Sequence, residues 1–278
     1  MFVKACIQII SSRENSINLC IDSIKKYYTY KYPYPIFVHY FDDIYDRREM
    51  FGVEFISVPY NTPSHIKEEE LFYHRTNNYA KRFGVERKGY LHMCNFICNM
   101  YGYPNTKLHE YDYIFTFDDD SGLIKELDFD PITLVAERGY KMSAAISSQR
   151  LKDGKIPQNH IDTRERLWPF VVRFCQNNNI ELPFTHLKEN TYHYLNWSDG
   201  YIIDTKIYKT GLWKEWIAEI NEFGGIYKYR WGDNEIMSLF CYLLTGKPMK
   251  NLKLVENGYL KQDAFRNGIA PGVKNNEF

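Results

Sequence analysis

Residues 111–120 have the sequence Tyr-Asp-Tyr-Ile-Phe-Thr-Phe-Asp-Asp-Asp, an apolar stretch that runs directly into three acidic residues. The pattern of Tyr111–Phe117, alternating and then continuously apolar, is typical of a central, buried β-strand. Adjacent carboxylates repel one another, so the folded chain tolerates Asp118, Asp119 and Asp120 poorly unless a cation or hydrogen-bond donors offset their charge. We therefore predict that the alternate residues Asp118 and Asp120 bind one hard cation, Mn²⁺ or Mg²⁺.

A cation at this position would bridge a diphosphate and stabilise a departing nucleoside diphosphate, as Lewis acid and template. The structural alternative is a solvated turn, because Asp is common after strands. Acidic clusters also occur in phosphatases, nucleotidyltransferases and calcium sites. A nucleotidyltransferase would need a Gly-rich, basic phosphate loop near the first strand, and residues 11–14, Ser-Ser-Arg-Glu, are a poor match to one.

Strand and helix patterns alternate on both sides of this stretch. The predicted strands are Phe2–Ile10, Tyr34–Tyr40, Val53–Val58, Tyr111–Phe117, Met142–Ile146, Tyr201–Ile203 and Ile226–Tyr229. The first predicted helix has Ile17, Cys20, Ile21, Ile24 and Tyr28 on one face. Another runs from Pro131 to Gly139, with Asp130 as its N-cap. The other predicted helices are Gly89–Met100, Pro169–Asn177, Lys206–Ile220 and 233–244.

Repeated strand–helix units favour an α/β fold, a Rossmann-like α/β/α sandwich whose central sheet is mostly parallel. Ligands of such sheets bind beyond the carboxyl ends of the strands. Three segments are expected there: Ser11–Arg13, Asp42–Asp43 and Asp118–Asp120.

Two further motifs carry candidate chemistry. Residues 229–233, Tyr-Arg-Trp-Gly-Asp, lead into a helix. In a functional interpretation Asp233 is the base that deprotonates an acceptor hydroxyl, with Trp231 as a sugar-stacking platform. In a structural one Asp233 is only an N-cap, which would lower its pKa. Residues 89–94, Gly-Tyr-Leu-His-Met-Cys, contain His92, which is more often a hydrogen-bonded structural residue than a ligand.

Bulk composition excludes some functions. Lys+Arg and Asp+Glu balance at 35 each, so the charge predicts no nucleic-acid or anionic-membrane partner. The six cysteines show no disulfide-framework spacing and are interpreted as core residues. No apolar run is long enough for a transmembrane helix. Aromatic residues reach 17%, which suits a sugar-binding protein but is more often explained by packing.

In order along residues 3–262, these motifs resemble glycosyltransferase family 15, the fungal α-1,2-mannosyltransferases. Gly89–Phe96 is similar to the family's Tyr-Arg-His-Met-Cys-Arg-Phe stretch, Gly224–Asp233 to its Gly-Gly-Phe-Tyr-Glu-Arg-Trp-Gly-Asp stretch, and Ala5–Arg13 to its first strand and turn. The resemblance implies a GT-A fold, a nucleotide-sugar donor and Mn²⁺ near the end of the fourth strand.

The candidate site residues combine the positions derived above from the sequence with positions that the resemblance implies. The donor-binding candidates are Ser11, Arg13, Asp42, Tyr90, His92, Asp118, Asp119 and Lys261. The acceptor-binding candidates are Tyr229, Arg230 and Trp231, and the catalytic ones are Asp233, Asp199 and Tyr201.

The chain departs from the family at three of these positions. Asp118–Asp120 replaces its Glu-Pro-Asn or Glu-Pro-Asp and is closer to the DxD motif of other GT-A enzymes. Tyr201 aligns with a Glu often proposed as the nucleophile of a retaining mechanism, and Asp199 is the nearest carboxylate. Lys261 aligns with a metal-binding His and is expected to contact the diphosphate, with water, Glu256 or Asp263 completing the metal shell.

The expected function is metal-dependent transfer of a sugar to a hydroxyl of a glycan or glycoprotein acceptor. GDP-mannose is the donor implied by the resemblance, and a UDP-sugar such as UDP-xylose the one suggested by the departures. The alternative is an inactive sugar-binding protein on the same scaffold. We expect one GT-A domain over residues 1–278, with nucleotide binding by 1–120 and acceptor binding by 121–278. Fungal members carry an N-terminal membrane anchor. This chain begins at Met1 almost at its first strand, which favours a soluble enzyme, cytoplasmic or virus-encoded.

Overall fold

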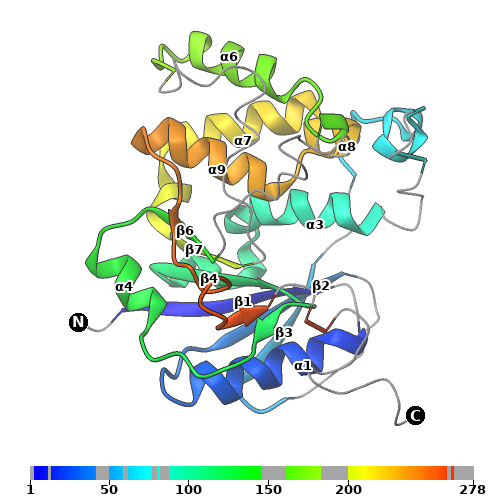
Figure 1. Ribbon diagram of the computed structural model, residues 1–278. Helices are drawn as coiled ribbons and strands as arrows, with labels where there is room; N and C mark the ends of the chain where they lie inside the picture. Colours follow the sequence, from blue (N-terminus) through cyan, green and yellow to red (C-terminus); the bar gives the residue numbers. More distant parts are fainter. Residues whose placement is uncertain are drawn as a thin grey trace.

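The computed structural model describes residues 3–11, 14–41, 50–58, 62–76, 80–81, 88–145, 161–182, 200–261 and 264–265. Within these residues a seven-stranded sheet has the order β3-β2-β1-β4-β7-β6-β8 (Figure 1). Its strands are β1 Ala5–Ser11, β2 Ile36–Phe41, β3 Val53–Val58, β4 Tyr113–Asp118, β6 Met142–Ala144, β7 Gly200–Asp204 and β8 Lys250–Asn251. A small second sheet pairs β5, Gly122–Leu123, with β9, Leu260–Lys261.

The central sheet is mostly parallel, as the alternation of strands and helices predicts. β1 pairs in parallel with β2 and β4, β2 with β3, and β6 with β8, whereas β7 runs antiparallel to β4 and β6. β2 and β4 lie on opposite sides of β1, so the strand order reverses direction there. The carboxyl ends of β1 and β4 therefore form the topological switch point at which such sheets bind ligands.

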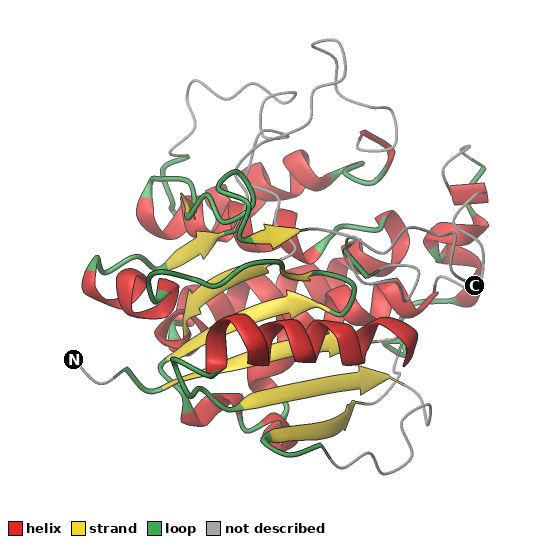
Figure 2. Ribbon diagram, turned by 60° about the horizontal axis from the view of Figure 1, so that its bottom comes forward, coloured by secondary structure: helices red, strands yellow, loops and turns green. Residues whose placement is uncertain are grey.

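Helices cover both faces of the sheet and create two hydrophobic cores (Figures 1 and 2). On one face lie α1 (Glu14–Ile24), which continues as a π-helical turn at Lys25–Thr29, and α4 (Pro131–Glu137). The other face carries α3 (Lys88–Asn99), α6 (Leu167–Asn177), α7 (Gly211–Phe223), α8 (Gly225–Tyr229) and α9 (Asp233–Thr245). The sandwich predicted from the sequence is confirmed.

Local sequence signals explain several boundaries. The predicted apolar face of the first helix is fully buried at all five of its positions. Asp130 is the N-cap of α4, where its carboxylate accepts from the backbone N–H of Ile132 at 3.1 Å. Gly246, with a positive φ of 68°, ends α9. All six cysteines lie in the described residues and are buried without forming a disulfide, which confirms their interpretation as core residues.

Two predicted elements are wrong in type or extent. Residues 226–229 were expected as a strand but belong to helix α8, which left-handed residues flank on both sides, Gly224 at φ 73° and Arg230 at φ 60°. Packing overrides the β propensity of this apolar segment, because its helical turn buries Ile226 and Tyr227. The helix expected from Lys206 begins as a 3₁₀ turn, and α7 itself starts only after Thr210, whose hydroxyl caps it.

The backbone of α8 contacts the Trp231 ring so closely that only glycine fits at position 225. A Cβ built on Gly225 overlaps three ring atoms of Trp231. We expect Gly225→Ala to lower the free energy of unfolding by about 1–3 kcal/mol, the usual cost of overpacking. Gly211→Ala is the matched control, because its Cβ meets nothing within 4 Å. Urea unfolding of both variants checks the prediction, which is wrong if the two midpoints agree.

Candidate active site

The three aspartates lie at the switch point of the sheet, at the end of β4. Asp118 pairs with Ile10 of β1 and is half-buried, whereas Asp119 and Asp120 are 1% and 4% exposed. Ser11, the last residue of β1, donates its hydroxyl hydrogen to Asp119 at 2.9 Å. The acidic cluster is therefore built into the fold rather than extended into solvent, and Asp119 joins the two strand ends.

The C-terminal segment packs against this acidic turn. The backbone of Lys261 in β9 pairs with Gly122 in β5, two residues after Asp120. Further along, the backbone N–H of Phe265 donates to the carbonyl of Asp120 at 2.8 Å. The side chain of Lys261 is exposed. The fold thus brings the backbone of Lys261 to the acidic turn, although about 140 residues separate the two in sequence.

The donor set of the turn suits a hard cation. Carboxylate oxygens are the ligands that Mn²⁺ and Mg²⁺ prefer, and such ions commonly keep one or two protein carboxylates and take their other ligands from water and substrate phosphates. Among the described residues, no group of three or more His, Cys, Asp or Glu side chains is arranged to hold a metal. Asp118 and Asp120 fit a site that the diphosphate itself would complete, rather than a closed structural site.

Asp233 lies in a second polar cluster, on the sheet face covered by α3 and α9. It is the first residue of α9 and is 4% exposed. The thiol of Cys94 in α3 donates to its Oδ1 at 3.5 Å. The N-cap of the helix is Gly232 rather than Asp233, so the capping interpretation of Asp233 is wrong by one residue.

Burial raises the pKa of Asp233 to about 6, and the negative charge of Glu235 adds to this increase. Glu235 forms a salt bridge with Arg164, whose side chain is only 3% exposed. Burial acts to raise the pKa of Glu235 as well, but Arg164 and other favourable contacts keep that pKa below its usual value. Burial, together with the charge of an ionised Glu235, thus holds the pKa of Asp233 near neutrality, the range suited to a general base.

Tyr201 connects the two clusters. It faces Thr116 across the β4–β7 ladder, so its side chain is on the α3 side of the sheet, as is that of Asp118. Burial raises the pKa of Tyr201 well above its usual value, and Asp233 and Asp118 both contribute. Its hydroxyl is buried and has no hydrogen-bond partner among the described residues. Tyr201 therefore stays protonated as a hydrogen-bond donor near both carboxylates.

A buried hydroxyl without a partner costs stability in the ligand-free protein. We expect Tyr201→Phe to leave the free energy of unfolding unchanged or to raise it by about 1 kcal/mol. Tyr227→Phe is the matched control, because the Tyr227 hydroxyl lies 3.1 Å from Nδ1 of buried His92. Losing that bond should lower stability by about 1 kcal/mol. Chemical denaturation of both variants measures the difference, and an equal loss in both would contradict it.

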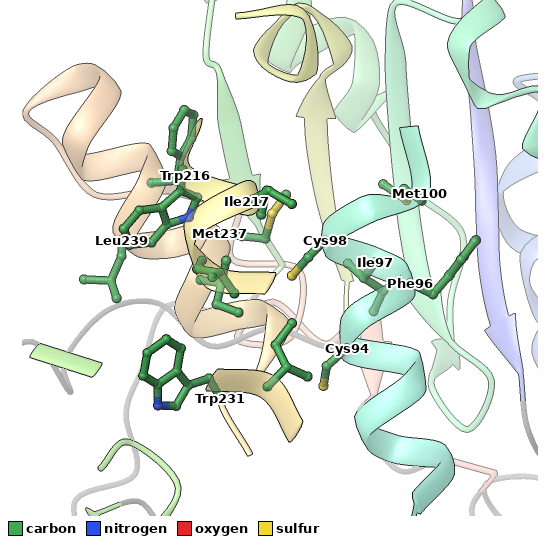
Figure 3. Packing of buried hydrophobic residues seen from close by; sticks show 14 of the residues in the cluster. Cys94, Phe96, Ile97, Cys98, Met100, Trp216, Ile217, Trp231, Met237 and Leu239 are labelled. Carbon is green, nitrogen blue, oxygen red and sulfur yellow. The ribbon is translucent and has the colours of Figure 1, made fainter. Parts of the chain in front are cut away.

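The acceptor-binding prediction for Trp231 disagrees with the structure. Trp231 has 0% exposure and its indole N–H donates to the carbonyl of Glu165 at 2.9 Å. Its ring packs against Phe170 and Phe223, and Figure 3 shows it within the same buried cluster as Trp216. A ring enclosed in this way has no free face for a sugar, so Trp231 is a core residue.

Tyr229 and Arg230, which precede Trp231 in the chain, also pack against other side chains. Tyr229 is half-buried, stacks on Phe223 with 5.8 Å between ring centroids, and lies under the Arg75 guanidinium at 4.9 Å. The Arg230 guanidinium lies 4.0 Å from the centroid of the Tyr90 ring. These contacts place Tyr90 and Arg230 together beside Asp233. Burial is the main cause that raises the pKa of the Tyr90 phenol, and the negative charge of Asp233 raises that pKa further.

The structure gives His92 a structural position. The ring is 3% exposed and its hydrogen bond to Tyr227 ties α3 to α8. Its predicted role in donor binding therefore lacks support, and the structural alternative fits. Arg13, Asp42 and Asp199 lie outside the described residues, as does Asp263. Glu256 accepts from the Asn251 side chain at 2.9 Å.

Sequence reasoning missed the partners of Asp233. Cys94 belongs to a motif that was singled out, but only packing of α3 on α9 shows that its thiol meets the carboxylate. Glu235 follows Asp233 by two residues, and this acidic pair at a helix start was the available signal. Nothing in the sequence pointed to Arg164, which is 71 residues from its partner.

The strand order, the antiparallel β7 and the acidic turn at the switch point define the class of protein, a GT-A-type glycosyltransferase fold. The family model described as glycolipid 2-alpha-mannosyltransferase, that of glycosyltransferase family 15, matches residues 3–270, so the chain belongs to this family. Within the described part of the chain, no helix combines the length and apolarity needed to cross a bilayer.

Similar proteins agree with this assignment. A probable mannosyltransferase of Candida albicans, MNT3, is 26% identical over 202 residues, which are 71% of this chain and 50% of that protein. The glycolipid 2-alpha-mannosyltransferase of Saccharomyces cerevisiae is 20% identical over 263 residues, 88% of this chain and 58% of its own length. The chain thus spans only about half to three fifths of the length of these relatives.

Two solved structures share the fold. The S. cerevisiae mannosyltransferase Ktr4p in complex with GDP superposes with a TM-score of 0.67 at 20% identity, covering 85% of this chain and 66% of that one. Core-mannan synthase A of Aspergillus fumigatus, in its Mn/GDP form, gives a TM-score of 0.64 at 15% identity and covers 87% and 70%.

Proposed function

We propose that this chain is a metal-dependent glycosyltransferase that moves a sugar from GDP-mannose to a hydroxyl of a glycan acceptor. One observation carries the proposal: a family 15 chain has three aspartates at the switch point of its sheet, two of them buried. The neighbours support the choice of donor, because one was crystallised with GDP and another in an Mn/GDP form. A UDP-sugar is the alternative donor, since Asp118–Asp120 is closer to the general DxD motif.

In this proposal Asp118 and Asp120 hold the divalent cation, which supplies charge neutralisation for the leaving nucleoside diphosphate. Lys261, exposed beside the acidic turn, adds a positive charge for the diphosphate. Asp119 is engaged with Ser11 and keeps the ends of β1 and β4 in place. In the proposed complex the sugar nucleotide lies between this turn and Asp233, and the Tyr201 hydroxyl donates a hydrogen bond to it.

Asp233 is the proposed base. Its raised pKa of about 6 leaves it ionised at neutral pH yet basic enough to accept the proton of the acceptor hydroxyl. A retaining double displacement needs a carboxylate beneath the anomeric carbon, and a protonated tyrosine occupies the family position proposed for it. We therefore favour direct displacement at the anomeric carbon, with one base and inversion of configuration.

A thermal-shift screen tests the proposal directly. With Mn²⁺ present, we expect GDP and GDP-mannose to raise the melting temperature more than UDP and UDP-xylose, and EDTA to remove the increase. Hydrolysis or transfer of the donor separates an enzyme from a binding protein, which would show the shift without turnover. NMR of the product then gives the anomeric configuration, and an α-linked mannoside would contradict the inverting mechanism.

A further inference from the structure

A second cavity lies at the end of the sheet opposite the acidic turn. It has a volume of about 440 Å³ and lies between the C-terminal end of α3 and α7, which lines it from Trp213 to Asn221. Tyr101 precedes β4 and Tyr208 follows β7, whose last residue, Asp204, pairs with Tyr113, the first residue of β4. Because Asp118 ends the same strand β4, the length of the sheet separates this cavity from the aspartates.

Aromatic rings form part of the wall. Tyr101 stacks on Tyr208 with ring centroids 5.1 Å apart and 19° between the planes, and Trp213 meets Tyr208 edge-on at 5.2 Å. Tyr101 is only half-buried, so its ring borders the open part of the cavity. In Figure 3, Cys98 of α3, another lining residue, points toward α7 and α9. Rigid aromatic walls of this kind suit a flat or ring-shaped ligand.

The charged groups of the cavity wall are both cationic. Lys209 and Lys214 line it and are exposed, and Lys209 Nζ lies 5.9 Å from the centroid of the Tyr101 ring. Neither lysine forms an ion pair with a described residue. The Tyr208 hydroxyl is buried and has no hydrogen-bond partner in the described structure, so Tyr208 contributes its ring rather than its hydroxyl to the wall. None of the described lining residues carries a carboxylate.

This composition selects for one kind of ligand chemistry. The hydroxyls of a neutral sugar both donate and accept, and carboxylates usually accept from them. The described wall has no carboxylate, and its two side-chain amides, Asn99 and Asn221, are hydrogen-bonded to each other at 2.8 Å. A phosphate presents acceptor oxygens and negative charge, which the two exposed lysines, Lys209 and Lys214, match. The cavity is also large enough for a ring together with a phosphate.

We infer that the cavity between α3 and α7 binds a phosphate ester carried on a ring, with Lys209 and Lys214 at the phosphate and Tyr101 against the ring. Nucleotides and sugar phosphates share this chemistry. The site is separate from the proposed donor site and needs no metal. It is therefore a second ligand site of the chain rather than a part of the acidic turn.

Isothermal titration in EDTA tests the inference, with GMP, mannose 6-phosphate and unphosphorylated mannose as probes. We expect at least one phosphate probe to bind, and mannose to bind about tenfold or more weakly. Lys209→Ala/Lys214→Ala should weaken the phosphate probes about tenfold or more, and Tyr101→Ala should weaken the preferred one. Lys206→Ala/Lys250→Ala removes two exposed lysines that do not line the cavity and should change nothing. Preference for GMP identifies a nucleotide site, and preference for mannose 6-phosphate a sugar-phosphate site.

Two results would overturn the inference: absence of binding by both phosphate probes at millimolar concentration, or equal affinity in the wild type and the Lys209→Ala/Lys214→Ala variant. The same titrations on Asp118→Asn/Asp120→Asn keep this site apart from the proposed donor site. Phosphate binding in EDTA should survive that double substitution. If it is lost while Lys209→Ala/Lys214→Ala has no effect, the probes occupy the acidic turn and the second site does not exist.

Discussion

Asp233→Asn is expected to lower sugar transfer about 100-fold or more, the usual scale for loss of a general base, while leaving donor affinity unchanged. The amide has nearly the shape of the carboxylate, so the contact with Cys94 and the start of α9 can persist. It has no basic oxygen for the proton of the acceptor hydroxyl. Initial rates of transfer and a donor titration on the same preparation separate the two effects.

The pH dependence of transfer gives a second test of the same residue. Burial and Glu235 raise the pKa of Asp233 to about 6, so the base becomes protonated and inactive as the pH falls through that value. In the wild type, kcat/KM should therefore decrease on the acid side with an apparent pKa near 6. The Asp233→Asn variant should lose this decrease, and a wild-type profile that stays flat down to pH 5 would contradict the assignment.

The Asp233→Asn substitution, which should lower activity, should leave the stability of the fold unchanged or raise it. The pKa of Asp233 is higher in the folded chain than the ordinary 3.8, so the folded state binds the proton more tightly. Ionised Asp233 thus destabilises the fold, and this penalty develops as the pH rises from about 4 to about 6 and persists above it. At pH 7–8 we expect Asp233→Asn to be as stable as the wild type or more stable, by up to about 3 kcal/mol.

Asp130→Asn is the control variant, which we expect to lower stability without lowering the rate of sugar transfer. Asp130 caps α4 and accepts from the hydroxyls of Tyr28 and Tyr34 at 2.6 Å each. This variant should melt at a lower temperature and retain normal transfer. If Asp233→Asn behaves in the same way, Asp233 is a structural residue and the proposal that it is the base fails.

The sheet and most helices could be predicted because their signals are local. Tyr111–Phe117 has the apolar pattern of a buried strand, and the helix that begins at Pro131 carries its own cap. Residues 226–229 show where local signals fail. Their apolar, β-prone composition suits a strand, but the helical turn buries Ile226 and Tyr227 and sets Gly225 against the Trp231 ring.

The site was predictable only where chain topology determines it. Asp118–Asp120 could be placed at a switch point, because the carboxyl ends of parallel strands meet at one edge. Burial could not be predicted, and it decides the outcome for Trp231 and His92, which look like ligand-binding residues in the motifs but are packed in the core. The raised pKa of Asp233 depends first on its burial and then on the charge of Glu235, and only the folded chain buries Asp233 and brings Arg164 to Glu235.

Asp120→Asn is expected to abolish Mn²⁺-dependent donor binding with little change in the fold. Loss of a residue that only hydrogen-bonds to a metal ligand typically weakens metal binding about 10- to 100-fold. If Asp118 and Asp120 are themselves the protein ligands of the cation, the affinity for the sugar donor in Mn²⁺ should fall by at least as much. Because three adjacent carboxylates repel one another, removing one charge should leave the melting temperature of the metal-free protein unchanged or slightly higher.

Asp112→Asn is the matched control for Asp120→Asn. Asp112 is exposed and immediately precedes β4, so it carries the same charge at the opposite end of the same strand. Donor titrations with Mn²⁺ and with EDTA should give a large difference for the wild type and Asp112→Asn, and none for Asp120→Asn. If Asp120→Asn still responds to Mn²⁺ as the wild type does, the cation is held elsewhere. The proposal that the acidic turn holds the cation would then be wrong.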